Sequence, residues 1–391
     1  MTNKVITLRV IALFFGGPMK KIITRTSLLV LSMALSGCNI LPSNETATQT
    51  KGESSETQVK APQSKPAMKI ETNEADKKAV AEIKEVLKAQ DFNGTIFIAK
   101  NNKVIMNEAL GQKNSDGDPL QPDNMFLIGS SQKFLTGLVV RKLEDEGLIN
   151  RNQQLSYYLP EFNGFDITIK NLLMHRSGFL KYETSQDYLG LDKTVDIIRQ
   201  NGVDPAFHNV YNYNDANYIV LAKVIEQVTK KSYKENVQHY LIKPLHLSRT
   251  GFYDDKELQP YFAEGFTHNF GFDNRVVPYG LDQFDGAGNI YMSAQDMGLL
   301  ARAFYDNKLF SADETTLLKT NVDDNAQPYR YGFNVKRGYL RLRGYFYNQE
   351  VICWFDKRFT LAIASNKIDP KKAKHNEENL LKVYNIVGKL K

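Results

Sequence analysis

Cysteine and histidine are scarce in this chain of 391 residues, which has two of the first and six of the second. Cys38 lies in the amino-terminal segment and Cys353 in a predicted strand, so we expect no disulfide and a fold held by its core. The histidines form no His-x-x-x-His pair and the cysteines form no pair, so no metal site is predicted. No cofactor is predicted either, because Gly286-Ala287-Gly288 lacks the strand–turn–helix context of a dinucleotide loop.

The chain also carries little excess positive charge outside its amino-terminal segment. The net charge is +6, but residues 1–38 contain five Lys or Arg side chains and no acidic residue, which leaves +1 for the remainder. A nearly neutral domain lacks the basic surface that binds nucleic acid, so no nucleic-acid partner is predicted. Hydrophobic residues make up 42% of the chain, which is enough for a large core and too much for a disordered protein.

The amino-terminal segment lacks a hydrophobic run long enough to cross a membrane, although it has the features of an export signal. Two lysines follow Met19, and the apolar run from Ser27 to Leu35 falls short of the ~20 residues that span a bilayer. The ending Leu35-Ser36-Gly37-Cys38 resembles the lipobox of bacterial lipoproteins, in which the cysteine is diacylated. An ordinary secretory signal with a chance cysteine is the alternative. Because a complete signal begins at Met19, that residue is a candidate for the true start.

We therefore expect three parts: a lipoprotein signal peptide over 1–38, a disordered linker over 39–73 and a folded domain over 74–391. The linker is rich in Ser, Thr, Gln, Lys, Glu and Pro and has almost no large apolar residue. A lipid on Cys38 would anchor the protein in the cell membrane, and the linker would hold the domain at its extracellular face.

Strand patterns lie at both ends of the folded part, and helical patterns lie between them. Strands are predicted over 93–99, 103–106, 339–347, 350–355 and 359–364, and helices over 74–90, 130–146 and from about 376. The first two strands form a hairpin with its turn at Asn101-Asn102. This order predicts an α/β (α+β) fold, in which both ends of the chain build one antiparallel sheet flanked by helices. The helical middle would form an inserted all-helical subdomain.

The strongest functional signal is Ser130 followed by Lys133 at the predicted start of a helix. Side chains three residues apart lie on the same face of a helix, one turn apart. The helix start also offers unpaired N–H groups to a developing oxyanion. The pair therefore predicts a serine nucleophile and a lysine base, which must be neutral to accept a proton. The alternative is a serine that caps the helix and a lysine that faces solvent.

A second element, Tyr213-Asn214-Asp215, comes before another helical pattern. A tyrosine oxygen close to Ser130 and Lys133 would relay a proton to the leaving group. In the alternative interpretation, Tyr213 only stacks at the helix start and Asp215 caps the helix.

Two further blocks resemble signatures of the β-lactamase-related serine hydrolases, a family that includes class C β-lactamases, D,D-peptidases and esterases. Residues 167–178 resemble the Ile-Thr…Leu-Leu-x-His-x-Ser-Gly signature, and residues 286–297 resemble the Gly-Gly…Ser/Thr-x-x-Asp-Met/Leu element. The likeness extends over about residues 90–370. It implies that Ser130 is the nucleophile, Lys133 the base and Tyr213 the proton relay.

Residues 125–134, 213–226 and 286–292 are similar to teichoic-acid D-alanyl esterases within this family. Asp215 stands where the wider family has an amide. A carboxylate there would favour the ammonium form of Lys133, oppose simple base catalysis by it, and attract the ammonium group of a D-alanyl ester.

The third motif of the family, a strand that borders the site, is matched best by Arg343-Gly344-Tyr345. Its final glycine is lost, so Tyr345 would project towards the substrate. The resemblance implies substrate contacts for Arg343, Gly344, Tyr345 and Asn289. It also implies an oxyanion hole formed by the N–H groups of Ser130 and Phe346.

The resemblance implies an enzyme that removes D-alanine from teichoic acids through an acyl-enzyme on Ser130. A D,D-carboxypeptidase or a low-activity penicillin-binding protein that acts on peptidoglycan stem peptides is the alternative. A non-catalytic protein that binds a wall polymer is a third possibility, which the intact Ser130, Lys133 and Tyr213 disfavour. Either polymer would be the partner of the folded domain.

Overall fold

The computed structural model describes residues 69–269, 271–320, 328–368 and 373–390. The predicted signal peptide, Cys38 and nearly all of the predicted linker lie outside the described residues. Within the described ranges, no helix combines the length and the apolar character needed to cross a membrane.

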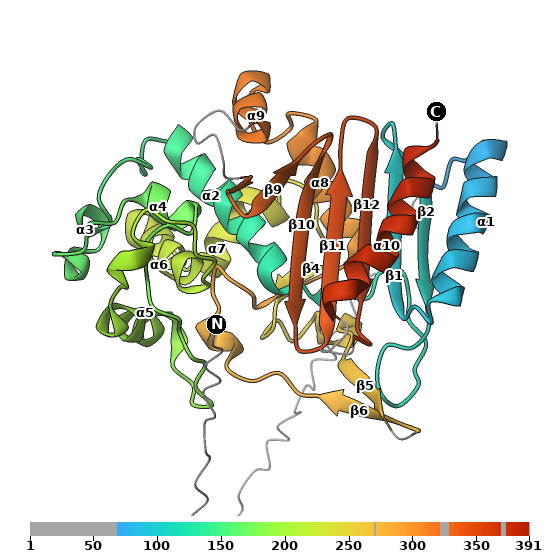
Figure 1. Ribbon diagram of the computed structural model, residues 1–391, viewed down its shortest axis with the longest axis horizontal. Helices are drawn as coiled ribbons and strands as arrows, with labels where there is room; N and C mark the ends of the chain where they lie inside the picture. Colours follow the sequence, from blue (N-terminus) through green and yellow to red (C-terminus); the bar gives the residue numbers. More distant parts are fainter. Residues whose placement is uncertain (1–68, 270, 321–327, 369–372, 391) are drawn as a thin grey trace, which may run out of the picture. The chain divides into compact units, whose positions relative to one another are not determined.

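A seven-stranded antiparallel sheet is the largest element of the described chain (Figure 1). Its strands lie in the order β2 (Lys103–Leu110), β1 (Gly94–Lys100), β12 (Phe359–Ser365), β11 (Gln349–Phe355), β10 (Tyr339–Phe346), β9 (Phe333–Lys336) and β8 (Tyr329–Arg330). Strand β1 pairs with β12, and Gly94 lies opposite Ser365. The hairpin turn has Asn101 and Asn102 at φ +48° and +64°, as a tight turn of this kind requires. The predicted sheet built from both ends of the chain is confirmed.

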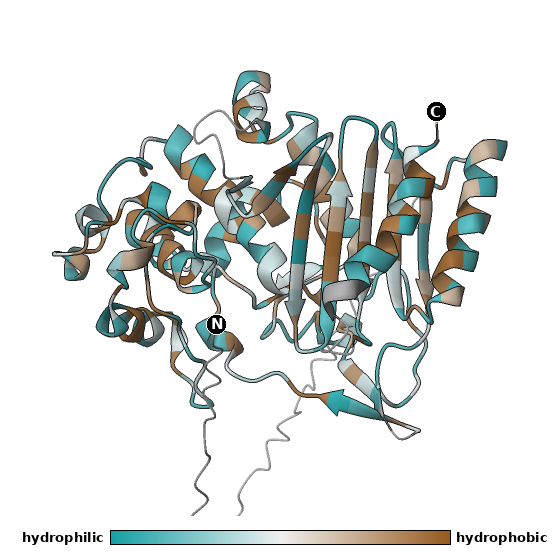
Figure 2. Cartoon of the chain, viewed as in Figure 1, coloured by the Kyte–Doolittle hydropathy of each residue, from teal (hydrophilic) through white to brown (hydrophobic). Residues whose placement is uncertain are grey.

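Helices cover both faces of this sheet, and β1, β11 and β12 are therefore buried along their whole length. Helices α1 (Glu74–Ala89) and α10 (Ala373–Gly388) pack on one face, and α8 (Ala294–Tyr305) packs on the other. Along β1, Ile96 and Ile98 face the first pair of helices, whereas Phe97 contacts Gly298 of α8. Figure 2 shows the apolar residues concentrated along these strands and on the inner sides of the helices.

The other part of the domain is mainly helical and places the central helix beside the sheet. It contains α2 (Gln132–Asp145), α3 (Leu155–Tyr158), α4 (Ile169–Leu173), α5 (Gly190–Asn201), α6 (Ala216–Thr229), α7 (Tyr233–Val237) and α9 (Ala312–Lys319). Helix α2 is buried on almost every side, so a polar side chain on it must find its partners inside the protein.

Several short strands were not predicted from the sequence. Strands β3 (Phe126–Leu127), β7 (Ile290–Met292) and β4 (Thr250–Phe252) form a small sheet, and β5 (Gly265–Asn269) pairs with β6 (Phe272–Val276). The small sheet leads directly to Ser130.

Candidate active site

Ser130 lies where the small sheet passes into the central helix. The Ile128 N–H donates to the Ile290 carbonyl at 3.0 Å. A 3₁₀ turn over Gly129–Ser131, which we call the nucleophile turn, then leads into α2. Gly129 has φ +48°, and a Cβ added to it would lie 3.1 Å from the backbone of Tyr345. Glycine therefore lets the nucleophile turn adopt this backbone and approach strand β10.

The Lys133 side chain is fully buried one turn after Ser130. Its Nζ lies 3.1 Å from Ser130 Oγ, 3.0 Å from the Ala287 carbonyl oxygen and 2.7 Å from Asp215 Oδ1. Two hydrogen bonds, to Ser130 and Ala287, and an ion pair with Asp215 therefore compensate the buried ammonium group. The alternative of a lysine that faces solvent is excluded.

The surroundings of Lys133 favour its protonated form. Burial lowers the pKa of Lys133, but the Asp215 carboxylate and the Tyr213 oxygen raise it by more, and the pKa lies above its usual value. Lys133 is therefore an ammonium at neutral pH, as expected for a lysine beside a carboxylate. A neutral lysine base is not the resting form of the site.

Tyr213 and Asp215 reach the site from the loop before α6. Asp215 directs its carboxylate to Lys133, and Asn214 Oδ1 accepts instead from the Ala216 N–H at 3.0 Å, at the start of the helix. The alternative in which Asp215 only caps α6 is therefore excluded. The Tyr213 hydroxyl interacts with Ser130 and Lys133. Burial raises the pKa of Tyr213, and the Lys133 charge opposes this increase.

A buried hydrogen-bond network fixes the segment behind Lys133. Gln132 Nε2 donates to Asn289 Oδ1 at 2.9 Å, and Asn289 Nδ2 donates to Asp285 Oδ1 at 2.8 Å. Thr136 Oγ1 donates to the carbonyl of Gly286 at 2.8 Å. Asn289 was expected to contact substrate, but both ends of its buried amide are engaged by protein groups. It holds the chain that precedes the carbonyl acceptor of the lysine.

A cleft of about 500 Å³ opens in front of the nucleophile. Its lining is aromatic and basic, and consists of Ser130, Tyr211, Tyr213, Tyr329, Gly332, Asn334, Arg341, Arg343 and Tyr345. The last three are alternate residues of β10 and share one face of the strand. Arg343 Nε donates to Glu350 Oε1 at 2.7 Å, and Arg341 forms an ion pair with Glu377. Carboxylates therefore balance the two positive charges of this wall.

Gly344 brings β10 against the nucleophile turn. A Cβ at this position would lie 1.8 Å from the Ile128 carbonyl oxygen and 2.8 Å from the Ser130 nitrogen, so only glycine allows the approach. Phe346, two residues on, packs on Phe284 with ring centroids 5.0 Å apart. The structure thus places the third motif beside the nucleophile, and the oxyanion donor at Phe346 stays a prediction.

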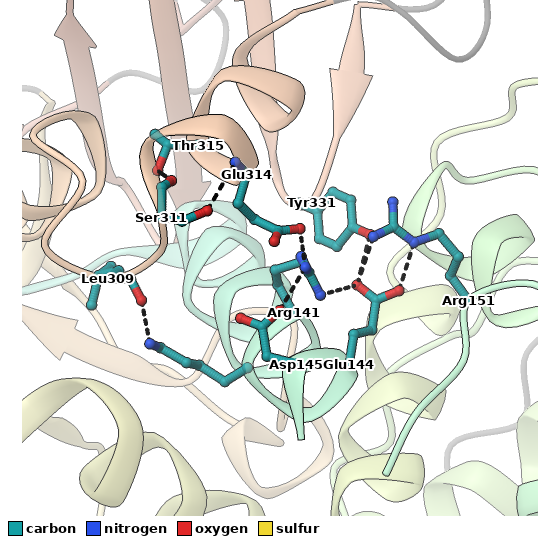
Figure 3. Close-up of polar contacts among 10 residues, drawn as sticks. Arg141, Glu144, Asp145, Arg151, Leu309, Ser311, Glu314, Thr315 and Tyr331 are labelled. Carbon is teal, nitrogen blue, oxygen red and sulfur yellow. Dashed lines mark hydrogen bonds and ion pairs between the residues drawn. The ribbon is translucent and has the colours of Figure 1, made fainter. Parts of the chain in front are cut away.

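Charged residues anchor the turn between β8 and β9 to α2 (Figure 3). The Tyr331 hydroxyl donates to Glu144 Oε2 at 2.9 Å, and Arg151 Nε donates to Glu144 Oε1 at 2.6 Å. Arg141, one turn earlier on α2, forms an ion pair with Glu314 of α9. This network holds the turn against the helix that carries the lysine.

Tyr211, Tyr329 and Gly332 line the site but were not predicted from the sequence. Gly332 has φ +82°, and a Cβ there would lie 2.1 Å from the carbonyl carbon of Lys133. Tyr329 reaches the cleft from a strand of two residues, which is too short to show a periodic pattern. The available signals were the position of Tyr211 two residues before Tyr213 and the Tyr-Gly pair that marks the turn.

Comparison with known proteins gives the family. Residues 80–385 match the β-lactamase family model. Over 311 residues the chain is 39% identical to the teichoic acid D-alanine hydrolase of Staphylococcus aureus, a match that covers 78% of this chain and 77% of that protein. The crystal structure of FmtA from Staphylococcus aureus superposes with a TM-score of 0.77 at 38% identity, covering 83% of this chain and 93% of that one.

A penicillin-binding protein from Bacillus halodurans superposes with a TM-score of 0.65 at 19% identity, covering 78% of this chain and 99% of that one, and shows the shared fold alone. The predicted fold and the predicted class of serine hydrolase are confirmed. The chain belongs to the β-lactamase family.

Proposed function

We propose that the protein is a serine esterase that removes D-alanine from teichoic acids through an acyl-enzyme on Ser130. The carrying observation is the Asp215 carboxylate, which pairs with Lys133 next to Ser130 while its side chain stays 42% exposed. A D-alanyl ester brings an ammonium group that a carboxylate attracts, whereas a stem peptide or a β-lactam brings a carboxylate that it repels. The similarity to the Staphylococcus aureus hydrolase supports the same substrate class.

Acylation begins when Ser130 Oγ attacks the carbonyl carbon of the ester. The Ser130 proton moves to Lys133 Nζ as Lys133 passes one of its own protons to Asp215 Oδ1, so Lys133 stays an ammonium. The raised pKa of Lys133 means that the lysine begins as an ammonium, and the relay needs no free neutral lysine. The polymer alkoxide leaves with the proton of the Tyr213 hydroxyl, and the proton on Asp215 returns through Lys133 to the Tyr213 oxygen.

The tetrahedral intermediate places a negative oxygen in front of the nucleophile. We assign the backbone N–H groups of Ser130 and Phe346 as its donors, since oriented donors in a site with little water stabilise such a charge strongly. The close packing at Gly129 and Gly344, which brings the β10 backbone to the nucleophile turn, supports this assignment.

Deacylation repeats these steps with water as the nucleophile. Water attacks the D-alanyl ester on Ser130 and gives its proton to the Lys133–Asp215 pair. Ser130 Oγ then recovers a proton and D-alanine leaves.

The β10 wall is suited to the rest of the polymer. Arg341 and Arg343 line the cleft with guanidinium groups that stay partly exposed beside their carboxylate partners, and guanidinium groups bind the phosphates that a teichoic acid carries. Tyr345 donates from its hydroxyl to Asn348 Oδ1 at 3.1 Å, which fixes its ring at the wall. Among the described strands, β9 pairs with β10 only at Tyr339, Leu340 and Arg341, so the edge of β10 beyond Arg341 has no strand partner there.

Release of D-alanine from purified D-alanylated lipoteichoic acid tests the proposal. We expect Ser130→Ala to lower the rate by at least about 10³-fold, because the nucleophile is lost. Ser131→Ala is the matched control, since Ser131 is buried and its Oγ donates to the Val351 carbonyl at 3.4 Å. Absence of release by the wild type, or equal release by wild type and Ser130→Ala, would falsify the proposal.

A D,D-carboxypeptidase or low-activity penicillin-binding protein is the second candidate, because Arg343 in the cleft could hold the carboxylate of a stem peptide. Rapid stoichiometric labelling of the wild type by a fluorescent penicillin, together with cleavage of D-Ala-D-Ala peptides, would favour it. Loss of both in Ser130→Ala would assign them to this site.

We also propose a lipid anchor on Cys38 that holds the enzyme at the extracellular face of the cell membrane, within the cell envelope. Cys38 lies outside the described residues, so the support is the lipobox-like sequence at 35–38. The envelope polymer named for the Staphylococcus aureus relative adds to it. Incorporation of an alkyne-tagged fatty acid by the wild type and not by Cys38→Ala is expected, and equal labelling of both contradicts the anchor.

A further inference from the structure

His175 is a buried histidine beside the site that no step above uses. It follows α4, and its backbone lies in the left-handed region at φ +53°. The His175 N–H donates to the Leu172 carbonyl at 3.1 Å, and the Arg176 N–H donates to the Asn171 carbonyl at 2.7 Å. These two bonds form the Schellman arrangement that ends many helices, where glycine or asparagine is usual. Histidine occupies this position instead, with its imidazole buried beside the site.

The imidazole holds the loop that carries the proton relay. His175 Nδ1 accepts from the Asn214 N–H and from Asn217 Nδ2, both at 3.3 Å. The His175 carbonyl accepts from the Asn212 N–H at 2.8 Å. These bonds fix the position of the chain on both sides of Tyr213. Because N–H groups donate to Nδ1, the ring proton lies on Nε2 and the imidazole is neutral.

The same ring packs against the tyrosine itself. The centroids of His175 and Tyr213 lie 4.3 Å apart with 40° between the planes. Tyr329 and Tyr218 pack on the imidazole as well, at 4.8 and 5.1 Å. Burial and the Lys133 charge hold the pKa of His175 well below its usual value, so the ring stays neutral at physiological pH and keeps its acceptor.

We propose that His175 is a positioning residue that holds the Tyr213 hydroxyl where it can protonate the leaving alkoxide. This inference rests on the proposed chemistry of Ser130 and deepens it. His175 is not itself the base, because donors from Asn214 and Asn217 occupy its Nδ1. A proton donor displaced by about 1 Å from its acceptor can lower a rate by roughly 10²-fold. The position of the Tyr213 ring, which His175 fixes, therefore governs kcat.

Kinetics of His175→Gly and His175→Asn test the proposal. Both replacements tolerate the left-handed backbone, but only asparagine brings an acceptor, its Oδ1, near the place of Nδ1. With D-alanylated lipoteichoic acid and glycerol monoacetate as substrates, two esters whose alkoxide leaving groups must be protonated, we expect His175→Gly to lower kcat by about 10- to 100-fold and to leave KM within about twofold. His175→Asn should stay within about fivefold of the wild-type kcat, because the acceptor is restored.

The chain offers a matched control in His246, which has the same φ of +53° and is exposed. His246→Gly should keep the wild-type kcat. A wild-type kcat in His175→Gly, or equal losses in the glycine and asparagine variants, overturns the proposal. If His175→Gly fails to fold, His175→Gln takes its place, since its amide replaces Nε2 and leaves the position of Nδ1 without an acceptor.

The two substrates separate this proposal from the proposed function. Hydrolysis of glycerol monoacetate that is lost in Ser130→Ala reports the chemistry of the site, including protonation of the leaving alkoxide, whatever the natural substrate. An enzyme that hydrolyses this ester but releases no D-alanine would contradict the proposed substrate, while the comparison of the His175 variants on the ester would still decide the role of the imidazole.

Discussion

The two walls of the cleft are built in different ways. On the helical wall, the Lys133 side chain is fully buried and bound by Ser130, Ala287 and Asp215. On the strand wall, Arg343 keeps a quarter of its side chain exposed, and a carboxylate balances its charge. Proton transfer needs groups held to a fraction of an ångström, whereas the binding of a long polymer tolerates side chains that keep some freedom. The first wall therefore suits chemistry and the second suits binding.

Removal of the Asp215 charge, which lies behind the helical wall, should have the largest effect on kcat. Asp215→Asn deletes the proton acceptor of the relay, and we expect kcat at pH 7 to fall about 100-fold. It also deletes a charge that raises the pKa of Lys133, so that pKa falls and neutral lysine forms at lower pH than in the wild type. Residual activity should therefore rise between pH 7 and 10, in contrast to the wild-type profile. Parallel profiles of kcat against pH for the wild type and Asp215→Asn would contradict the relay.

A steric change against the same wall should have an intermediate effect. A Cβ in Gly332→Ala would meet the Lys133 carbonyl, whereas Gly338→Ala, also at positive φ, would place its Cβ in open space. We expect Gly338→Ala to lower the free energy of unfolding by about 1–2 kcal/mol, the cost of a left-handed alanine. Gly332→Ala should lower it by about 1–3 kcal/mol more and also reduce kcat. Urea denaturation measures the free energy of unfolding of both variants. Equal losses in the two would show that the turn between β8 and β9 does not pack closely on α2.

Breaking the strand wall should have the smallest effect. Burial raises the pKa of Glu350, and Asn376 and Arg343 lower it, so loss of the arginine alone would leave a buried carboxylate without its cation. The double variant Arg343→Gln/Glu350→Gln removes the pair without changing the net charge. We expect KM for lipoteichoic acid to rise about threefold at low salt with kcat unchanged, and the difference to shrink at high salt. An equal change for neutral p-nitrophenyl acetate would show that Arg343 does not act on the polymer charge.

Local features of the site could be predicted from the sequence, and features that join distant segments could not. The spacing of Ser130 and Lys133 is helical, so their contact follows from residues three apart. His175 and Tyr329 come from segments far from both, and the packing of their rings on Tyr213 depends on the complete fold. Asn289 shows the same limit, because its sequence context did not reveal that both ends of its amide are used inside the protein.

The same distinction between local and distant contacts separates the strands that were predicted from those that were not. The long strands of the main sheet were predicted because four or more residues in each show a pattern that a helix does not. Strands β3, β7 and β8 have only two or three residues, and pairing with distant partners defines them. The nucleophile turn and the tyrosine-bearing edge of the cleft both depend on such strands.

The pairing of β1 with β12 has a consequence for how the enzyme comes into being. Strand β1 emerges early in synthesis, and the partner that completes the sheet on one side of it is made near the end of the chain. The nucleophile turn likewise precedes β10, the strand that it packs against, by most of the helical region. Contacts between such distant segments form late in folding. The cleft therefore joins segments made early and late in synthesis, so we expect the nucleophile turn to meet β10 only when almost the whole chain is available to fold.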